Sequence, residues 1–309
     1  MEILITGGAG FIGSHILAQL QRRRDMDVVV FDNLSSGSKE HVPAGMELVE
    51  GDICDEAAVD ALFADHHFDA VVHLAAQTMV PFSVDHPVED CQINLEGVLH
   101  VLEACRTHGT GHILFSSSAA VYGDNLHIPL KETERLVPTS PYGITKMTTE
   151  HYLRVYHELY GMDATIFRFA NVYGERQGEK GEGGVVSIFC KLLSQRQGIT
   201  VFGDGNQTRD FVYVGDIAQA IIRALPLKGC HTMNVSTGQE TSINDLIRSF
   251  EKAVGYTVPV QYTAPRTGDI LRSVLSNEAL KRDLGFVPEM DLEEGIRRTY
   301  DWYRSQWTK

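Results

Sequence analysis

The chain has 309 residues, enough for one large domain or for a domain with a smaller companion. Hydrophobic residues make up 43% and charged residues 22%, as in globular proteins, and the formal net charge is −14. An acidic surface repels phosphate backbones and anionic lipid, so nucleic acid and membranes are poor candidate partners, whereas a few local arginines would still suffice to bind a small anion.

The spacing of cysteine and histidine argues against disulfides and metal sites. The 5 cysteines are scattered without a CxxC motif, and the 13 histidines show no HExxH pattern. We therefore expect buried thiols, no bound metal and a reducing, cytoplasmic setting. No apolar run approaches the ~20 residues of a membrane span, and the opening segment EILITGG is typical of a core strand rather than a signal peptide.

Apolar strands alternate with amphipathic helices in the first half of the chain. Strands are expected at 2–6, 27–32, 46–52, 68–76, 112–117 and 164–170, and helices at 11–24, 55–67, 87–108 and 142–160. Continuously hydrophobic strands separated by helices predict a parallel sheet that is covered on both faces. The expected fold class is therefore α/β, with a Rossmann-type doubly wound parallel sheet.

After residue 171 the pattern loosens into shorter elements. A glycine-rich, charged loop covers 175–184, helices are expected near 185–195, 216–224, 242–254 and 292–307, and strands at 199–203 and 210–214. We predict an NAD-binding Rossmann domain over 1–170 and a smaller C-terminal α/β substrate-binding lobe over 171–309. Segments at about 210–236 are expected to return to the first domain.

The segment TGGAGFIG, residues 6–13, has the glycine spacing of a phosphate-binding turn. Gly8, Gly10 and Gly13 satisfy GxGxxG, and Gly7, Gly10 and Gly13 satisfy the GxxGxxG spelling. Glycines permit a tight turn and close approach of the backbone, and the helix that follows offers N–H groups and a positive dipole to a pyrophosphate. Because the motif directly follows the first strand, it predicts a dinucleotide site.

Asp32 ends the second expected strand. A carboxylate at this place accepts hydrogen bonds from the ribose hydroxyls and repels a 2′-phosphate, so it favours NAD over NADP. The alternative is that Asp32 only caps the turn NLSSG that follows it. Asp52 ends the third strand and is expected to face the adenine.

Tyr142 and Lys146 lie four positions apart in SPYGITK, so they share one face of a helix. A phenol with a pKa of ~10 is a poor base at neutral pH. An adjacent ammonium and a positive nicotinamide ring both favour the phenolate and lower that pKa, and Ser118 in SSSAAVYG can hold or relay the same proton. The alternative is an incidental YxxxK pattern, which the glycine motif and the serine segment disfavour.

These motifs together resemble the extended short-chain dehydrogenase/reductase family, and within it the UDP-glucose 4-epimerase-like enzymes. The resemblance covers nearly the whole chain and is carried by TGGAGFIGSH, DNLSSG, GDI, HLAAQ, NLEGV, SSSAAVYG, SPYGITK, RFANVYGERQ, GDGNQTRDFVYVGDIA and PRTGD. One departure is Glu175, where many relatives have proline. The resemblance implies a tightly bound NAD and a UDP-sugar substrate.

The resemblance also implies roles for individual residues. The catalytic residues would be Tyr142, Lys146 and Ser118. Those at the cofactor would be Gly7, Gly10, Phe11, Ile12, Gly13, Asp32, Asn33, Asp52, Ile53, Leu74, Ala75, Ala76, Asn94, Ser116, Tyr142, Lys146 and Phe169. Those at the substrate would be Ser118, Tyr142, Asn171, Arg209, Arg266, Asp269 and Ser273. For Arg209 the alternative is an ion pair with the adjacent Asp210.

The reaction must be chosen among those that begin by oxidising C4 of the sugar. Dehydratases that this fold resembles carry acidic residues where this chain has Ala119 and Ala120, and without an acid and a base there elimination has no evident catalyst. We therefore expect an NAD-dependent C4 epimerase that interconverts UDP-glucose and UDP-galactose. The alternatives are a UDP-glucuronate 4-epimerase, another dehydratase or reductase of the family, and a non-catalytic NAD-binding sensor.

Two further expectations come from the resemblance. Ser273 stands where some relatives carry a bulky tyrosine beside the sugar, so UDP-GlcNAc and UDP-GalNAc would also fit, unless Leu271 or Arg272 fills the gap. In the family, the helices that match 87–108 and 142–160 pair with a second copy. Apolar residues on more than one face of both helices agree with a homodimer: Val98, Leu99, Val101 and Leu102, and Tyr152, Val155, Tyr156 and Leu159.

Overall fold

The fold is described from a computed structural model that covers residues 1–23, 25–178, 183–265 and 270–307. The chain forms two compact units. Unit 1 consists of Met1–Asp124, Glu134–Arg168 and Ala218–Met233, and unit 2 of Asn125–Thr133, Phe169–Ile217 and Asn234–Lys309. The sequence placed a division at 170 and a return near 210–236, but it did not anticipate the short excursion of 125–133 into unit 2.

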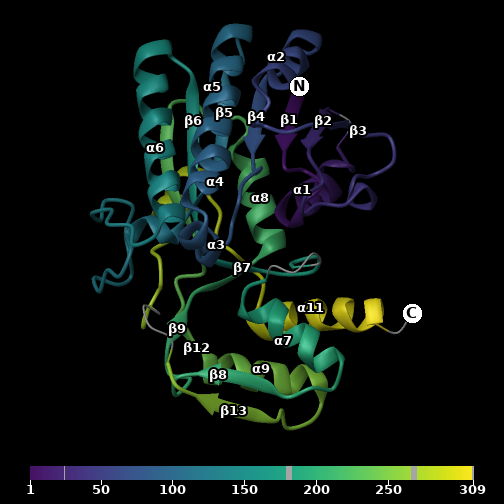
Figure 1. Ribbon diagram of the computed structural model, residues 1–309, viewed down its shortest axis with the longest axis vertical. Coiled ribbons are helices and arrows are strands. Elements are labelled where there is room, and N and C mark those ends of the chain that lie inside the picture. The colour runs from purple at the N-terminus through teal and green to yellow at the C-terminus, as the bar shows by residue number, and fades with distance from the viewer. Residues whose placement is uncertain (24, 179–182, 266–269, 308–309) are drawn as a thin grey trace. The chain divides into compact units, whose positions relative to one another are not determined.

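A central sheet of seven strands has the order β11-β6-β5-β4-β1-β2-β3 (Figure 1). The strands are β1 (Glu2–Thr6), β2 (Asp27–Asp32), β3 (Glu47–Glu50), β4 (Ala70–His73), β5 (His112–Ser118), β6 (Asp163–Phe169) and β11 (Cys230–Val235). Parallel pairs join β1 to β2 and β4, β2 to β3, and β4 to β5; Ile3, for example, lies opposite Val28 and Ala70. The predicted α/β fold with a doubly wound parallel sheet is confirmed.

Helices complete unit 1. They are α1 (Phe11–Leu20), η1 (Lys39–His41), α2 (Glu56–Asp65), α3 (Val80–Asp85), α4 (Pro87–Cys91), α5 (Gly97–His108), η3 (Ala119–Tyr122), α6 (Pro141–Tyr160) and the greater part of α8 (Val214–Ala224). In Figure 1 α5 and α6 lie on the same side of the sheet, where Val101, Leu102 and Leu153 join the main buried cluster. The single helix expected over 87–108 is instead interrupted by the π-helical segment η2 (Gln92–Glu96).

Helix α6 carries the predicted Tyr142–Lys146 pair, and its limits follow from the local sequence. Ser140 caps the N-terminus because its Oγ accepts a hydrogen bond from Gly143 N at 3.1 Å, and Pro141 occupies the first turn, where it removes no helical bond. The helix ends at Gly161, whose φ of +71° is the left-handed conformation that glycine adopts without steric cost. This 20-residue helix therefore begins just before the tyrosine.

Unit 2 contains short strands and four helices of its own. Its strands pair as β7 (Asn171–Tyr173) with β10 (Phe211–Tyr213), β8 (Ile199–Phe202) with β13 (Val260–Thr263), and β9 (Thr208–Arg209) with β12 (Thr241–Ser242). Its helices are α7 (Val185–Ser194), α9 (Ile243–Val254), α10 (Glu278–Leu284) and α11 (Leu292–Trp307), and α11 packs on α7 and α9. Nowhere in the described residues of either unit does a helix have the length and apolar content needed to cross a bilayer.

Candidate active site

The glycine loop packs so closely against the end of β4 that two of its glycines cannot be replaced without a clash. A Cβ on Gly7, whose φ is +69°, would lie 2.6 Å from Ala75 N, and one on Gly13 would lie 2.5 Å from Gly8 Cα. A Cβ on Gly10 would meet only Gly7 O, at 3.2 Å. Gly10 therefore precedes α1 with an open side, and the small residue there leaves room for a group such as a pyrophosphate at the helix N-terminus.

Asp32 connects the end of β2 to this loop. Its Oδ2 accepts a hydrogen bond from Ala9 N at 2.9 Å, and its Oδ1 accepts one from Leu34 N at 2.8 Å. The second bond is the turn-capping role considered above, and the first holds the glycine loop. Neither role excludes the predicted ribose contact, because each carboxylate oxygen has more than one acceptor site.

Asn33 and Asp52, both predicted to lie at the cofactor, contact each other. Asn33 Nδ2 donates to Asp52 Oδ2 at 2.9 Å, and Cys54 N donates to Asp52 Oδ1, also at 2.9 Å. Burial acts to raise the pKa of Asp52, but these two hydrogen bonds favour the carboxylate, and the net effect is a lowered pKa. Ile53, the next predicted residue, is buried at 5% exposure.

Asn94 orders the loop that contains Leu74, Ala75 and Ala76. Its Oδ1 accepts a hydrogen bond from Gln77 N at 2.9 Å, and its Nδ2 donates one to Gln77 O at 2.9 Å. The side chain of Asn94 therefore holds both the backbone N–H and the backbone C=O of Gln77. Asn94 lies in the π-helical segment, a distortion that is frequent at functional sites. Sequence resemblance predicted the residue but gave no sign of this backbone geometry.

Tyr142, Lys146, Ser116 and Ser118 come together at the end of β5 and the start of α6. Tyr142 is 9% exposed and Lys146 is 2% exposed. The ammonium of Lys146 donates to Ser116 O at 2.9 Å and lies 5.8 Å from the centroid of the Tyr142 ring. Ser118 hydrogen-bonds the Tyr142 side chain, so the predicted trio forms one cluster.

Burial dominates the ionisation of this cluster. It raises the pKa of Tyr142 to about 12, against a lowering by the Ser118 hydrogen bond and together with a smaller increase from the charge of Asp90. It lowers the pKa of Lys146 to about 8, which Asp90 opposes. The expected decrease for Tyr142 is therefore wrong for the protein groups alone, because desolvation of the phenolate outweighs the help it receives.

A buried ion pair beneath the cluster was not predicted. Glu150 (0% exposed) binds Arg168 (1%) through Nε–Oε1 at 2.9 Å and Nη2–Oε2 at 2.7 Å. Glu150 also accepts from Ser117 Oγ at 2.6 Å, and Ser117 lies between Ser116 and Ser118. The pair thus fastens the serine segment of β5 to α6, two turns beyond Tyr142. A glutamate at i+4 from Lys146 on the same helix face was the only sequence signal for it.

Apart from Ser118 and Tyr142, the predicted substrate residues belong to unit 2. Asn171 is exposed in β7, and Arg209 in β9 donates from Nη1 to Thr208 O at 2.8 Å. Asp210 does not pair with Arg209; it is 1% exposed and accepts hydrogen bonds from Thr237 and Gly238. Ser273 is half-buried, and its N–H donates to Thr208 O at 3.2 Å. Phe169 is buried at the end of β6, and Arg266 and Asp269 lie outside the described residues.

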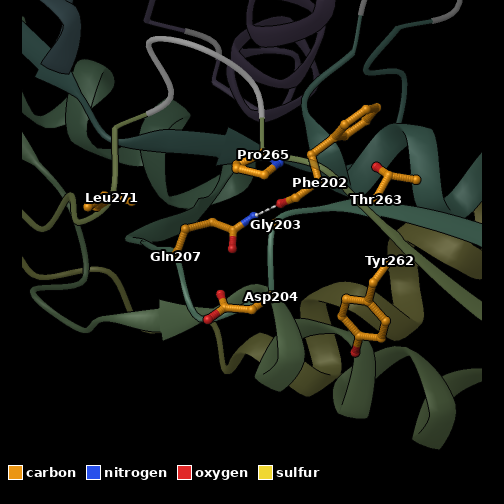
Figure 2. Close-up of a pocket in the computed structure, with 8 residues that line it drawn as sticks. All are labelled: Phe202, Gly203, Asp204, Gln207, Tyr262, Thr263, Pro265 and Leu271. Atoms are coloured by element: carbon orange, nitrogen blue, oxygen red, sulfur yellow. Dashed lines mark hydrogen bonds between the residues drawn. The ribbon is translucent and has the colours of Figure 1, made fainter.

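Unit 2 contains an open pocket of about 750 Å³ (Figure 2). It is lined by Phe202, Gly203, Asp204, Gln207, Tyr262, Thr263, Pro265 and Leu271. Gln207 is fixed by donating from Nε2 to Phe202 O at 2.7 Å, as drawn in Figure 2. Sequence reasoning singled out Leu271 only as a residue that might fill the gap at Ser273. It missed the rest of the pocket, although the segment GDGNQTRD, which begins directly after Phe202, was already among the shared motifs.

The two sites offer groups for a dinucleotide and for a polar small molecule. Among the residues that the structure describes, no cluster of three or more His, Cys, Asp or Glu side chains is arranged to hold a metal ion. Unit 1 combines a glycine turn, an acid after β2 and a tyrosine–lysine–serine cluster. Unit 2 combines an aromatic-lined pocket with Arg209.

Comparison with known proteins gives concordant results. The model of the NAD dependent epimerase/dehydratase family matches residues 3–236. UDP-glucose 4-epimerase of Mycolicibacterium smegmatis is 39% identical, over 99% of each chain. The structure of Thermotoga maritima UDP-glucose 4-epimerase with UDP-glucose is 39% identical, covers 99% of this chain and 100% of its own, and superposes with a TM-score of 0.96. The structure of UDP-N-acetylglucosamine 4-epimerase of Methanobrevibacter ruminantium, in complex with UDP-N-acetylmuramic acid, is 36% identical and has a TM-score of 0.93. The match covers 99% of this chain and 98% of that one.

Proposed function

The chain belongs to the NAD dependent epimerase/dehydratase family, and we propose that it is a C4 epimerase that interconverts UDP-glucose and UDP-galactose. The observation that carries this proposal is the cluster of Tyr142, Lys146 and Ser118 beside a glycine turn that fits a dinucleotide. Gly7, Gly10 and Gly13 would cradle the pyrophosphate of NAD, and Asp32 would hold the ribose.

NAD⁺, when bound, supplies the acceptor and later the donor of one hydride, and the positive ring that favours a nearby phenolate. The protein supplies the proton chemistry. Tyr142 Oη, as phenolate, removes the proton from the sugar 4-hydroxyl. The side chain of Ser118 hydrogen-bonds Tyr142 Oη. A 4-keto sugar would result because C4 gives up its hydride in the same step. The keto sugar would then rotate in the site, hydride would return to the opposite face of C4, and Tyr142 would return the proton to the 4-oxygen. Lys146 stabilises the charge, and its bond to Ser116 O fixes its position.

Ala119 and Ala120 argue for epimerisation over dehydration. They open the short helix η3 directly after β5, and their methyl groups supply neither an acid nor a base for elimination at C6. A reductase would consume a reduced cofactor, and an epimerase would purify with NAD bound. A UDP-glucuronate 4-epimerase remains the alternative substrate choice, because the same proton chemistry serves it. The complete tyrosine–lysine–serine set disfavours a non-catalytic sensor.

The pocket of unit 2 is the proposed site for the uridine diphosphate. Phe202 and Tyr262 offer ring faces on which a base can stack, and the guanidinium of Arg209 suits phosphate oxygens. Asn171, Arg266, Asp269 and Ser273 are proposed to complete the contacts to diphosphate, ribose and sugar. An acidic chain needs such local arginines to bind an anion.

Ser273 supports acceptance of N-acetylated sugars as well. The side chain that would otherwise fill the gap, Arg272, is engaged with Glu240 at 2.5–2.9 Å, and Leu271 lines the pocket with 69% exposure. We expect turnover of UDP-GalNAc to approach that of UDP-galactose. Ser273→Tyr should reduce turnover of UDP-GalNAc at least tenfold more than turnover of UDP-galactose. If the variant and the wild type discriminated equally between the two substrates, the proposed role of Ser273 would be refuted.

The primary test is a proton-NMR assay of purified protein with UDP-hexoses and no added cofactor. Interconversion of UDP-glucose and UDP-galactose is expected, with NAD released on denaturation. Tyr142→Phe should lose 10²–10⁴-fold in kcat while retaining NAD. Tyr152→Phe, on the exposed face of α6, is the matched control and should be unchanged. Full activity of Tyr142→Phe would contradict the mechanism.

We also propose that two copies form a homodimer in the cytoplasm. The apolar residues at 98–102 do not support it, because Val98, Val101 and Leu102 are buried in the core of unit 1. Exposed apolar side chains lie instead on α3, α4 and α6: Val84 (59%), Val88 (71%), Tyr152 (38%), Val155 (44%) and Leu159 (67%). Leu159→Arg should give a monomer in sedimentation equilibrium, whereas Leu126→Arg, equally exposed (71%) but outside these helices, should not.

A further inference from the structure

Asp90 is a buried carboxylate that has no role in the chemistry derived so far. It lies on α4 and is 0% exposed. Its Oδ1 accepts hydrogen bonds from Gln77 Nε2 at 2.7 Å and Asn94 Nδ2 at 3.0 Å, and its Oδ2 accepts one from Thr145 Oγ1 at 3.1 Å. Among the described residues no lysine, arginine or histidine pairs with it. Burying a carboxylate without a cationic partner is costly, which points to a function.

The three hydrogen bonds connect Asp90 to both sides of the proposed reaction centre. Asn94 and Gln77 belong to the clamp on the loop that follows β4, where cofactor contacts are proposed. Thr145 directly precedes Lys146 in α6, and its Oγ1 lies 2.9 Å from Tyr142 O. Asp90 therefore ties the cofactor loop to the helical turn that carries the catalytic pair.

Asp90 also carries a charge that acts on both members of that pair. Its negative charge raises the pKa of Tyr142 and of Lys146. The other titratable groups around the pair act differently. His73 at the end of β4 has its pKa lowered to about 3 by burial and is neutral. Glu150 in α6 is neutralised by Arg168 of β6, and Asp85 in α3 and Glu89 in α4 are solvent-exposed.

We propose that Asp90 is a positioning residue for the reaction, which holds the cofactor loop and the Tyr142–Lys146 turn together and sets the ionisation of that pair through its charge. Its kinetic consequence rests on the proposed epimerase function. The lysine would otherwise be an ammonium buried without an anion. With Asp90 in place, the ammonium is retained across neutral pH and can stabilise a phenolate during turnover.

The charge is tested by Asp90→Asn. The amide keeps an acceptor for Gln77 and Asn94, and its NH₂ can donate to Thr145 Oγ1, so the hydrogen bonds can all be retained. Loss of a negative charge lowers the pKa of every nearby group. Both limbs of the bell-shaped pH profile of kcat/KM should therefore move to lower pH, by about one unit. Glu89→Gln removes the same charge from the neighbouring, exposed position and should move neither limb.

The connection is tested by Thr145→Val, which is close in volume and leaves the charge of Asp90 in place. We expect kcat to fall about tenfold with KM little changed and with both limbs of the pH profile unmoved, because only the link to α6 is lost. If kcat of this variant equalled that of the wild type, the proposed role of Asp90 in holding the cofactor loop and the Tyr142–Lys146 turn together would be refuted. Thermal unfolding of each variant identifies any that fails to fold.

A titration that needs no turnover separates this proposal from the proposed function. The protein is labelled with ¹³C at lysine Cε, and the NMR signal of Lys146 is assigned by its loss in Lys146→Met. Its titration midpoint in Asp90→Asn should lie about one pH unit below that of wild type and of Glu89→Gln. An unchanged midpoint overturns the proposal. A lowered midpoint in a protein that converts no UDP-hexose would support Asp90 and refute the epimerase assignment.

Discussion

The glycine loop of unit 1 and the pocket of unit 2 are shaped by different parts of the chain. Backbone meets backbone in the loop, where Gly7 approaches Ala75 too closely for any side chain. Side chains of Phe202, Gln207 and Tyr262 line the open pocket of unit 2 (Figure 2). A surface made by closely packed backbone can be altered by substitution only at a cost in stability, whereas one made by side chains can be altered with little such cost. Under the proposed function, the part of the site common to all substrates lies in unit 1 and the choice of substrate in unit 2.

The largest effect should come from the buried ion pair of unit 1. Glu150→Gln leaves Arg168 charged and buried, which should cost about 3–5 kcal/mol in the free energy of unfolding. Glu240→Gln breaks an exposed pair with Arg272 in unit 2 and should cost nothing measurable. Chemical denaturation compares the two variants. If both were equally stable, unit 1 would not be the more rigidly determined region.

The glycine loop gives the next largest effect. Gly7→Ala forces a Cβ to within 2.6 Å of Ala75 N at a φ of +69°, and we expect a loss of about 2–3 kcal/mol in stability together with the loss of bound NAD. Gly109→Ala has a similar φ, +79°, but no atom within 4 Å of the added Cβ, so it should cost only about 1 kcal/mol. The difference between the stability losses of Gly7→Ala and Gly109→Ala measures the cost of the steric clash with Ala75. Equal losses would mean that only the backbone angle matters.

The sequence predicted unit 1 better than unit 2 for a physical reason. Strands such as 2–6 and 27–32 are buried on both faces, so their continuous hydrophobicity marks them, and β1 and β2 have these bounds. The strands β9 (Thr208–Arg209) and β12 (Thr241–Ser242) have two residues each and no pattern to detect. The strand β11 (Cys230–Val235) was missed because half of it is polar or only partly buried.

The same reason divides the site residues. The glycine spacing, Tyr142 and Lys146 lie within single motifs, so their proximity follows from one turn or one helix. Phe202, Gln207 and Tyr262 meet only because β8 and β13 pair. Asp90 and Thr145 are far apart in the sequence, and the 3.1 Å contact between them depends on the packing of α4 against α6. No pattern within a single segment encodes such a contact.

Substitution in the pocket should change affinity without changing stability. Phe202→Ala removes a ring on which a base can stack, and we expect KM for UDP-glucose to rise about tenfold with kcat nearly unchanged. Phe202→Tyr retains the ring and serves as the control. The thermal midpoint should move little, because Phe202 is only partly buried. A large loss of stability with unchanged KM would reverse the comparison, since the pocket would then be structural.

The smallest effect concerns Asn33 and Asp52, and it depends on pH. In protein freed of cofactor, Asn33→Ala removes one of the hydrogen bonds that hold the pKa of Asp52 down against burial. A carboxylate whose pKa is lower in the folded than in the unfolded state stabilises the fold above its unfolded value of ~4, and this contribution disappears as the pH falls through the folded value. The bond is partly exposed, so the loss should be about 0.5–1 kcal/mol at pH 7 and should become smaller as the pH falls below the unfolded value, as measured by denaturant unfolding at each pH. Asn33 also accepts from Ser35 N at 3.0 Å, and loss of that bond is the same at each pH. In an Asp52→Asn background the pH-dependent part should therefore vanish. If it persisted there, another group would be responsible, and this edge of unit 1 would not be ordered by the Asn33–Asp52 contact before the cofactor binds.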